Sequence, residues 1–359
     1  MAIAEVLLTN FRHFSSWQAS FDRRYNVMVG DNGTGKTSVL ESLHYLAYGK
    51  SFRAQHPRQL RQHQAEYYRV QARLETQDQV TTLQSTYQNS SGIQRSLDGQ
   101  IPATANEIAQ LLPTVFIDTG THRDLAHTPR YRRDFFNWCC FYTQNDYNTS
   151  MQRYQRIHSQ RNHYLKQAKH LGNAGLAAWN APYVYYAEQI HQARLKMCAL
   201  LQECVAEIWQ ILAPRWPEVQ IKYSPGWPQE SSLDELLQNS LAQDLALGYS
   251  QYGPHRADLK FSTTAASNIF HYFSQGQQKL YSYALKLAQL LLLKQLTSAQ
   301  TGILLIDDLP AELDEHSRNA ILAYIDTLDC QCFITGLSEQ DFPNLSSDQI
   351  HRLPPRRFT

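Results

Sequence analysis

The sequence predicts an α/β fold in two lobes, and three observations support this prediction. Near the N-terminus, the apolar run YNVMV (25–29) is typical of a short strand, and a glycine-rich loop and a helical pattern (38–49) follow it. From residue 134 to 216 the pattern is almost entirely helical. Near the C-terminus, GILLIDDL (302–309) and QCFITG (331–336) predict buried strands, as in a parallel sheet.

Length and composition limit the class of protein. The chain has 359 residues, 43% of them hydrophobic, which is enough for two domains or one bilobed domain. Its net charge is +1, so any surface for nucleic acid must be local. The six cysteines lack metal-site spacing and are expected to be reduced and buried. Because no apolar run could span a bilayer and no signal peptide is evident, we expect a cytoplasmic protein without a membrane partner.

The elements of the N-terminal third follow from local patterns. Residues 4–21 alternate apolar and polar side chains like two antiparallel strands, and residues 67–88 and 92–103 predict further strands of a hairpin sheet. Between these strands, GKSFRAQHPRQLRQH (49–63) is basic and broken by Pro57, so we expect a loop. EIAQLLPTVFID (107–118) predicts a helix that leads into a strand.

The rest of the chain is mostly helical until its last quarter. The helical region breaks at GNAG (172–175) and is too short for a long coiled coil. The remaining predictions are strands at 217–227 and 257–264, helices at 232–250 and 317–328, a long helix from about Gln275 to Gln295, and a mobile basic tail at 351–359.

The loop GDNGTGKT (30–37) has the spacing of a phosphate-binding loop. Glycine reaches backbone angles that let successive N–H groups point at one anion. Lys36 would reach the β- and γ-phosphates, and the Thr37 hydroxyl would ligate Mg²⁺. The predicted nucleotide contacts here are Gly30, Asp31, Asn32, Gly33, Thr34, Gly35, Lys36, Thr37 and Ser38.

Two acids follow the buried strand at 303–306, at the end where α/β sheets place their ligands. We expect Asp307 to hold Mg²⁺, directly or through water, and Asp308 to polarise the attacking water. A second anion site is predicted where Ser274 and Gly276 begin the long helix, because a helix N-terminus presents free N–H groups. This second site would serve the nucleotide of a partner subunit.

Together these motifs resemble an ABC-type ATPase head with a P-loop NTPase core. GDNGTGKT, FSQGQQK, IDDLPAELD and Thr335 occur in the order of the Walker A motif, the signature motif, the Walker B motif with its D-loop, and the switch position. Among such heads, the chain resembles the RecF family of bacterial recombination mediators along nearly its full length. The supporting stretches are TNFRHF (9–14), GKSFR (49–53), RYRRDFFNW (130–138), QRN (160–162) and YGPHRADL (252–259).

This resemblance implies an ATP-binding core lobe formed by residues 1–115 and 300–359, and a second, largely helical lobe at 116–299 that carries the signature motif, with no long coiled coil. It also implies a homodimer that forms with ATP, a slow DNA-dependent ATPase, and binding to double-stranded DNA and to single/double-strand junctions. The implied partners are RecO and RecR, which load recombinase at gaps.

Residue roles carry over from the resemblance by position. Lys36, Asp307 and Asp308 would be catalytic, and Thr37 and Asp307 would hold the metal. The signature residues that would contact ATP held by the other subunit are Ser274, Gly276 and Gln277, with Lys279 nearby. Asn32 would face the γ-phosphate, Asp314 would lie in the D-loop, and Thr335 stands where transporters have a switch histidine.

The chain departs from the family pattern at two places. Phe273 stands where a leucine usually precedes the signature serine, and we expect little effect. The loop at 116–133 lacks the glutamine of transporters, and Asp118 is its candidate Mg²⁺ contact.

Basic residues gather in three clusters, as phosphate backbones require in a nearly neutral chain. The predicted DNA contacts are Lys50, Arg53, Arg58, Arg61, Arg132 and Arg133, and a third cluster contains Arg153, Arg156 and Arg161. Any single cluster could instead be a solvated or ion-paired face, and Arg53 could lie beside the nucleotide.

Three other classes remain as alternatives. A nucleotide-binding subunit of a membrane transporter would have the switch histidine and glutamine that this chain lacks. An SMC-type head needs hundreds of heptad residues, for which the chain has no room. A nuclease ATPase of the overcoming-lysogenisation type needs a further acidic metal site, and the sequence shows none.

Overall fold

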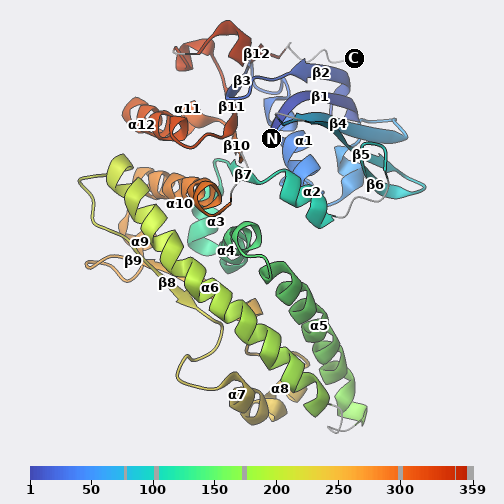
Figure 1. Ribbon diagram of the computed structural model, residues 1–359, viewed down its shortest axis with the longest axis vertical. Coiled ribbons are helices and arrows are strands. Elements are labelled where there is room, and N and C mark those ends of the chain that lie inside the picture. Colours follow the sequence, from blue (N-terminus) through green and yellow to red (C-terminus); the bar gives the residue numbers. More distant parts are fainter. Residues whose placement is uncertain (77–78, 101–104, 172–175, 298–301, 344, 354–359) are drawn as a thin grey trace. The chain divides into compact units, whose positions relative to one another are not determined.

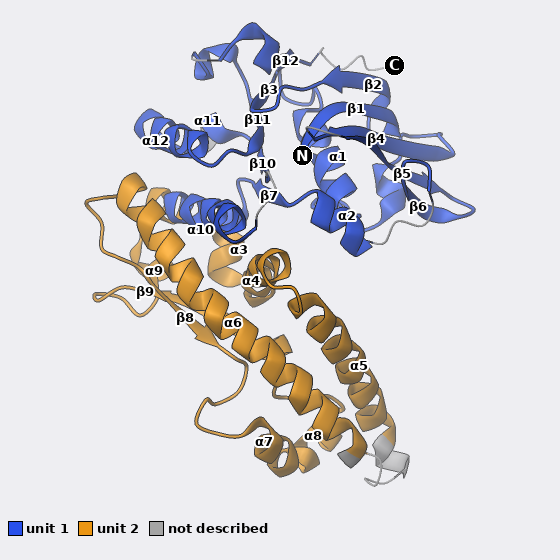
Figure 2. Ribbon diagram, viewed as in Figure 1, with its two compact units in different colours: residues 1–121, 279–359 blue, residues 122–278 orange. Residues whose placement is uncertain are grey.

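The chain forms two compact units in the computed structural model, which describes residues 1–359 except 77–78, 101–104, 172–175, 298–301, 344 and 354–359. The first unit contains Met1–Thr121 and Lys279–Thr359, and the second contains His122–Gln278 (Figure 2). The sequence predicted two functional lobes with boundaries at 115/116 and 299/300, and these lobe boundaries remain a prediction.

An antiparallel sheet in the first unit confirms the predicted hairpins (Figure 1). Its strand order is β2 (Phe14–Ser20), β1 (Ala2–Phe11), β4 (Tyr67–Glu75), β5 (Val80–Gln88) and β6 (Gly92–Leu97). Because side chains alternate between the faces of a strand, β4 buries every second residue and leaves the others at least partly exposed.

A parallel sheet in the same unit carries the loops that form the candidate site. Its order is β12 (Ile350–Arg352), β3 (Tyr25–Val29), β11 (Gln331–Gly336), β10 (Ile303–Ile306) and β7 (Thr114–Ile117). All residues of β3, β10 and β11 are buried, which explains their continuous apolar runs. Since all pairings are parallel, the carboxyl ends of these strands meet at one edge.

Helix α1 (Lys36–Tyr48) shares one hydrophobic core with both sheets. This core includes Leu8 from β1, Leu40 and Leu43 from α1, Met28 from β3 and Leu305 from β10, each at most 1% exposed. The other helices of the unit are α2 (Ala105–Leu111), most of α10 (Gln275–Leu296), α11 (Leu309–Glu312) and α12 (Glu315–Asp326), with single 3₁₀ turns at Pro57–Leu60, Glu339–Asp341 and Ser347–Gln349.

The second unit is largely helical, as expected. Its two long helices, α5 and α6, run side by side (Figure 2). Its elements are α3 (Thr121–His127, whose first residue belongs to the other unit), α4 (Pro129–Thr143), α5 (Tyr147–Leu171), α6 (Ala177–Leu212), β8 (Gln220–Ser224), α7 (Leu233–Asn239), α8 (Leu241–Leu247), a 3₁₀ turn at Pro254–Arg256, β9 (Asp258–Ser262) and α9 (Ile269–Tyr272).

Several local predictions need correction. The helix expected at 232–250 is two helices that meet at Ser240, and the tail expected to be mobile begins with β12, which pairs with β3. By contrast, the loop predicted at 49–63 is confirmed, with one 3₁₀ turn at Pro57–Leu60, and within it the ring of Phe52 stacks on that of Phe116 with centroids 4.0 Å apart. The predicted break at 172–175 lies outside the described residues.

The structure also bears on the predictions for the cysteines and the long helices. All six cysteines are buried and free, as expected. Among the described residues, no helix is long and apolar enough to cross a membrane, and none of the longer helices continues into a long coiled coil.

Candidate nucleotide-binding site

A cavity of about 530 Å³ lies at the carboxyl edge of the parallel sheet, over the N-terminus of α1. Residues far apart in the sequence meet there, because β11 lies between β3 and β10, so the loops after β3 and β10 and the end of β11 are neighbours. The predicted residues that line it are Asn32, Gly33, Gly35, Lys36, Thr37, Ser38, Arg53, Arg61, Asp307, Asp308 and Thr335. Gly30, Asp31 and Thr34 line a neighbouring cavity of about 460 Å³.

Glycine is required at two positions of the loop before α1 by backbone geometry. Gly33 has a φ of 85° and Gly35 a φ of 107°, in a region that other residues rarely adopt. At Gly35, a Cβ would also lie 2.2 Å from the His13 ring and 2.6 Å from the Phe14 ring. Gly35 caps α1 without any side-chain hydrogen bond, which leaves the first N–H groups of the helix for an anion.

Lys36 folds over this loop. Its ammonium donates to the carbonyl oxygens of Gly30 and Asp31, the second at 3.0 Å. Burial lowers the pKa of Lys36, and the nearby Asp308, Asp307 and Asp31 oppose that effect. The cavity therefore contains a partly desolvated cation that is suited to phosphate oxygens.

Asp307 connects three segments of the site. Its Oδ1 accepts hydrogen bonds from the Thr37 hydroxyl at 3.1 Å and from the Thr335 hydroxyl at 2.7 Å. Burial raises the pKa of Asp307, and the two hydroxyl hydrogen bonds lower it again in part. Thr335 also accepts a hydrogen bond from the backbone N–H of Asp308 at 2.7 Å, so this one side chain contacts both acids.

Asp308 has an unusual backbone. Its φ of 60° and ψ of 47° are left-handed, a conformation that aspartate tolerates better than most residues. This turn follows β10 directly and leads into α11, with Asp308 on the cavity wall. The roles of the two neighbouring acids toward a metal and a water remain predictions.

The donor set fits Mg²⁺. A carboxylate and a hydroxyl 3.1 Å apart are hard oxygen ligands, which this ion prefers. Asp118 is bound to its own loop, accepting from Gly120 N at 3.1 Å and the Thr121 hydroxyl at 2.8 Å. Its charge still raises the pKa of Asp307, so its role as a metal contact remains a prediction.

Comparison with known proteins identifies the family. The model of the RecF/RecN/SMC N-terminal domain family matches residues 2–353. A DNA replication and repair protein RecF from Hydrogenovibrio crunogenus is 34% identical over 349 residues, which cover 97% of this chain and 95% of that protein. The chain belongs to the RecF family. A RecF protein from Coxiella burnetii is also 34% identical, over 98% of this chain and 95% of its own length.

Solved structures of RecF proteins confirm the fold expected for this family. The recombination mediator protein RecF with ATP, from the RecFOR pathway, is 25% identical and superposes with a TM-score of 0.84 over 95% of this chain and 93% of that chain. An Smc head bound to the C-terminal winged-helix domain of ScpA matches with a TM-score of 0.58 at 14% identity, over 98% and 96% of the two chains. The ABC-type head fold is therefore shared, and the near-full-length match favours RecF over a transporter subunit.

Four residues that line the cavity were not expected there from the sequence: Arg12, His13, Gln59 and Thr119. Arg12 is clamped by Glu41 on α1, with its Nε 2.7 Å from Oε2 and its Nη2 2.5 Å from Oε1. His13 contacts the Thr34 carbonyl oxygen at 3.1 Å. The available signal was Glu41, an acid within the apolar helical run 38–49, because an acid on a buried helix needs a cation; in the structure Glu41 is fully buried.

The signature motif of this RecF family member begins α10. Ser274 and Gln277 form a reciprocal cap, in which the Ser274 N–H donates to Gln277 Oε1 at 2.7 Å and the Gln277 N–H to the serine hydroxyl at 3.4 Å. Gly276 is exposed, and a Cβ there would meet open space. Phe273 is buried and stacks on Trp209, and the small effect expected of this departure remains a prediction. Contact of these residues with ATP remains a prediction.

Asp314, the predicted D-loop acid, caps α12. Its carboxylate accepts from the Ser317 N–H at 2.8 Å, and this hydrogen bond lowers the pKa of Asp314.

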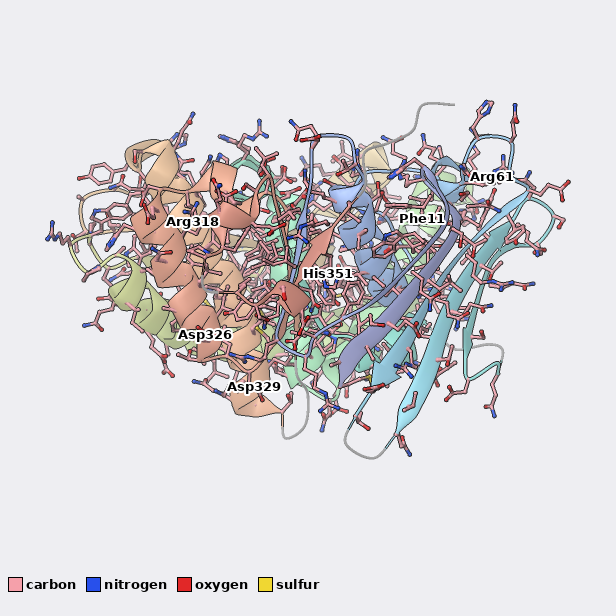
Figure 3. All side chains as sticks on the ribbon, turned by 90° about the horizontal axis from the view of Figure 1, so that it is seen from above. Phe11, Arg61, Arg318, Asp326, Asp329 and His351 are labelled. Atoms are coloured by element: carbon pink, nitrogen blue, oxygen red, sulfur yellow. The ribbon has the colours of Figure 1, made fainter. Side chains whose placement is uncertain are left out.

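The structure separates the predicted basic residues into different environments. Lys50 and Arg58 are exposed. Arg61 instead lines the cavity and forms an isolated antiparallel β-bridge with Phe11 (Figure 3). Arg132 binds Asp258 through two contacts of 2.8 and 2.7 Å, and Arg133 donates to the Ala257 carbonyl oxygen at 3.1 Å. Arg132 and Arg133 thus have protein partners, and their contact with DNA remains a prediction.

The three arginines of the third basic cluster, Arg153, Arg156 and Arg161, differ in their exposure to solvent. Arg161 is fully buried and cannot contact DNA, contrary to the sequence-based grouping. Arg153 and Arg156 are exposed on α5.

Proposed function

We propose that this chain is an ATP-dependent, DNA-binding recombination mediator that dimerises on ATP and resets by slow hydrolysis. One observation carries this proposal: Lys36, Asp307 and Thr335, from three separate segments, converge on one cavity over the N-terminus of α1. ATP in a solved RecF structure that is 25% identical supports the choice of nucleotide.

Each residue of the cavity has a distinct task in this proposal. The N–H groups at the start of α1 and the Lys36 ammonium bind and orient the β- and γ-phosphates. Thr37 and Asp307 would hold Mg²⁺, which when bound neutralises phosphate charge. Asp308 orients the attacking water and accepts its proton. Thr335 keeps both acids in register through its hydrogen bonds.

A second subunit completes the proposed site. The exposed N-terminus of α10, with Ser274, Gly276 and Gln277, offers N–H groups to the γ-phosphate of ATP held by another copy. Two ATP molecules would then join two chains. Without ATP, the interface would bring two phosphate-seeking surfaces together with no anion between them, so the free protein should be largely monomeric.

The proposed partners follow from the relatives. RecF relatives are DNA replication and repair proteins, and solved RecF mediators belong to the RecFOR pathway. We therefore propose binding to double-stranded DNA and to single/double-strand junctions, and cooperation with RecO and RecR in loading recombinase.

Sedimentation with and without Mg-ATP tests the proposal. Wild-type protein should double in mass with ATP, and its ATPase rate should rise more than linearly with protein concentration because each site needs two chains. Lys36→Ala should lose ATP binding and remain a monomer. An unchanged wild-type monomer at tens of micromolar protein, with ATP shown to be bound, would contradict ATP-driven dimerisation.

A further inference from the structure

Helix α5 has an unusual charge pattern. None of the 25 residues from Tyr147 to Leu171 is an aspartate or glutamate, although arginines and lysines recur along the helix. The nearest acid along the chain, Asp146, precedes the first turn. An ordinary solvated helix mixes both signs of charge along its surface, so this composition needs a physical reason.

The structure places the two faces of α5 in different environments. The inner face packs on α6 and α8 with Tyr154, Arg161 and Leu165, each at most 2% exposed. The outer face bears side chains that are cations or hydrogen-bond donors. Its exposed residues are Thr149, Gln152, Arg153, Gln155, Arg156, Ser159, Gln160, His163, Lys166 and Gln167.

The buried cation of α5 is already neutralised. Arg161 donates to Asp244 at 3.0 Å, whereas Arg153, Arg156 and Lys166 have no acid within ion-pair distance among the described residues. From Arg153 to Lys166 the helix rises about 20 Å, which is enough to follow several phosphates of one strand.

A neighbouring loop extends this face. Ser250 N donates to Asn162 Oδ1 on α5 at 2.8 Å, and a Cβ at Gly248 would lie 3.2 Å from Lys166 Cγ. In the same loop the exposed Arg256 stacks over Tyr249, with its guanidinium carbon 5.7 Å from the ring centre. A fourth cation and a partly exposed aromatic ring therefore lie on the loop beside Lys166.

We infer that the outer face of α5, together with Arg256, binds the phosphate backbone of duplex DNA. Phosphates accept hydrogen bonds from arginine, lysine, glutamine and serine, the side-chain types that are exposed here. An acidic protein partner fits less well, because the exposed positions of α5 between 147 and 167, where its side chains are described, include no large apolar residue to anchor a protein interface. This inference rests on the proposed DNA-binding function and assigns it a surface on the second unit, whereas the nucleotide cavity belongs to the first.

The test compares two charge-neutralising variants of the full chain. Arg153→Gln/Arg156→Gln removes two cations from α5. Lys222→Gln/Lys260→Gln removes two exposed cations that lie opposite each other on β8 and β9 in the same unit. Fluorescence anisotropy would follow a labelled 30-base-pair duplex of random sequence across a salt series, with poly-glutamate as a competitor and binding of a fluorescent ATP analogue as a check on folding.

The α5 variant should bind the duplex at least about tenfold more weakly near 0.15 M salt, and its salt slope should fall by about 1.8, or about 0.9 for each lost contact. The Lys222/Lys260 variant should match wild type, and ATP binding should be unchanged in both. Equal affinity and slope in the α5 variant would overturn the inference alone. Poly-glutamate that competes as well as unlabelled duplex would show a surface for acidic proteins and overturn it too. Wild-type protein that binds no duplex would overturn the proposed function as well.

Discussion

Asp307 shows how the site opposes the ordinary preferences of its residues. An isolated carboxylate avoids burial, yet this one is held beside a second acid by two threonine hydroxyls, from Thr37 and Thr335. Neighbouring Asp308 takes a left-handed backbone conformation. Such costs are expected where a fold keeps negative charge ready for a metal and a phosphate.

Asp307→Asn should therefore stabilise the nucleotide-free protein while it abolishes turnover. Burial raises the pKa of Asp307, so the folded chain holds this proton more tightly than the unfolded chain does. As pH rises from the unfolded value near 4 through the raised folded value, the ionised acid costs stability. The asparagine avoids that cost, so its advantage in Tm should grow across this window and stay constant above it.

The measurement is thermal unfolding from pH 4 to 8 without Mg²⁺, with the exposed Asp348→Asn as a matched control. The control should follow wild type at every pH. A lower Tm for Asp307→Asn at pH 7 would show that the hydroxyl hydrogen bonds outweigh the cost of burial.

Among the elements, strands and helices with a clear burial pattern could be predicted from the sequence, because burial itself creates the periodicity. The three-residue β12 is too short to show such a periodicity. Helices α7 and α8 meet at Ser240 within one continuous apolar pattern, so the sequence did not reveal the break between them. Ion pairs could not be predicted from the sequence either, because Arg161 and Asp244 are 83 residues apart and Arg132 and Asp258 are 126 residues apart. Sequence alone cannot distinguish a paired arginine from a free one, whereas the Walker motifs could be found because their residues are adjacent.

The buried pair of Arg161 and Asp244 should couple α5 to α8. Both side chains are fully buried, and Asp244 also accepts from Gln251 N at 3.2 Å. Arg161→Met or Asp244→Leu alone should each cost about 3–5 kcal/mol, because each leaves an unpaired buried charge. The double variant should cost clearly less than the sum. Urea unfolding of the four proteins measures this coupling, and additive losses would show that the pair does not interact.

The N-terminus of α10 should have separate structural and dimer-forming roles. Ser274→Ala removes the side-chain cap and should cost about 1 kcal/mol of stability while dimerisation with ATP persists. Ser274→Arg should lose the same cap and also block the partner's phosphate, so ATP binding should persist without dimerisation. Sedimentation and titration with a fluorescent ATP analogue separate these outcomes. Normal dimerisation of Ser274→Arg would remove α10 from the proposed interface.

The whole molecule is nearly neutral, at a net charge of +1, so its affinity for DNA must depend on how its cations are grouped. A monomer presents few phosphate contacts at once. Two chains joined by ATP would present each basic surface twice. The proposed ATP switch can therefore control DNA binding through the number of contacts, without any change in an individual arginine.

This argument predicts that ATP steepens the salt dependence of DNA binding. The ATP-bound protein should bind a duplex more tightly than the nucleotide-free protein, and each added phosphate contact should add about 0.9 to the negative slope of log affinity against log salt. Sequence-scrambled duplexes should compete equally, since backbone contacts carry no base information. Fluorescence anisotropy across a salt series, with and without Mg-ATP, measures both slopes.

Lys50→Glu/Arg58→Glu is the variant that isolates the basic loop in this experiment. Both residues are exposed and neither lines the nucleotide cavity, whereas Arg53 and Arg61 do and would confuse loss of DNA contacts with loss of ATP. The variant should dimerise with ATP as wild type does, yet bind DNA with a flatter slope. If wild type shows equal slopes in both nucleotide states, ATP does not control the number of DNA contacts, and dimerisation must serve another step of the proposed function.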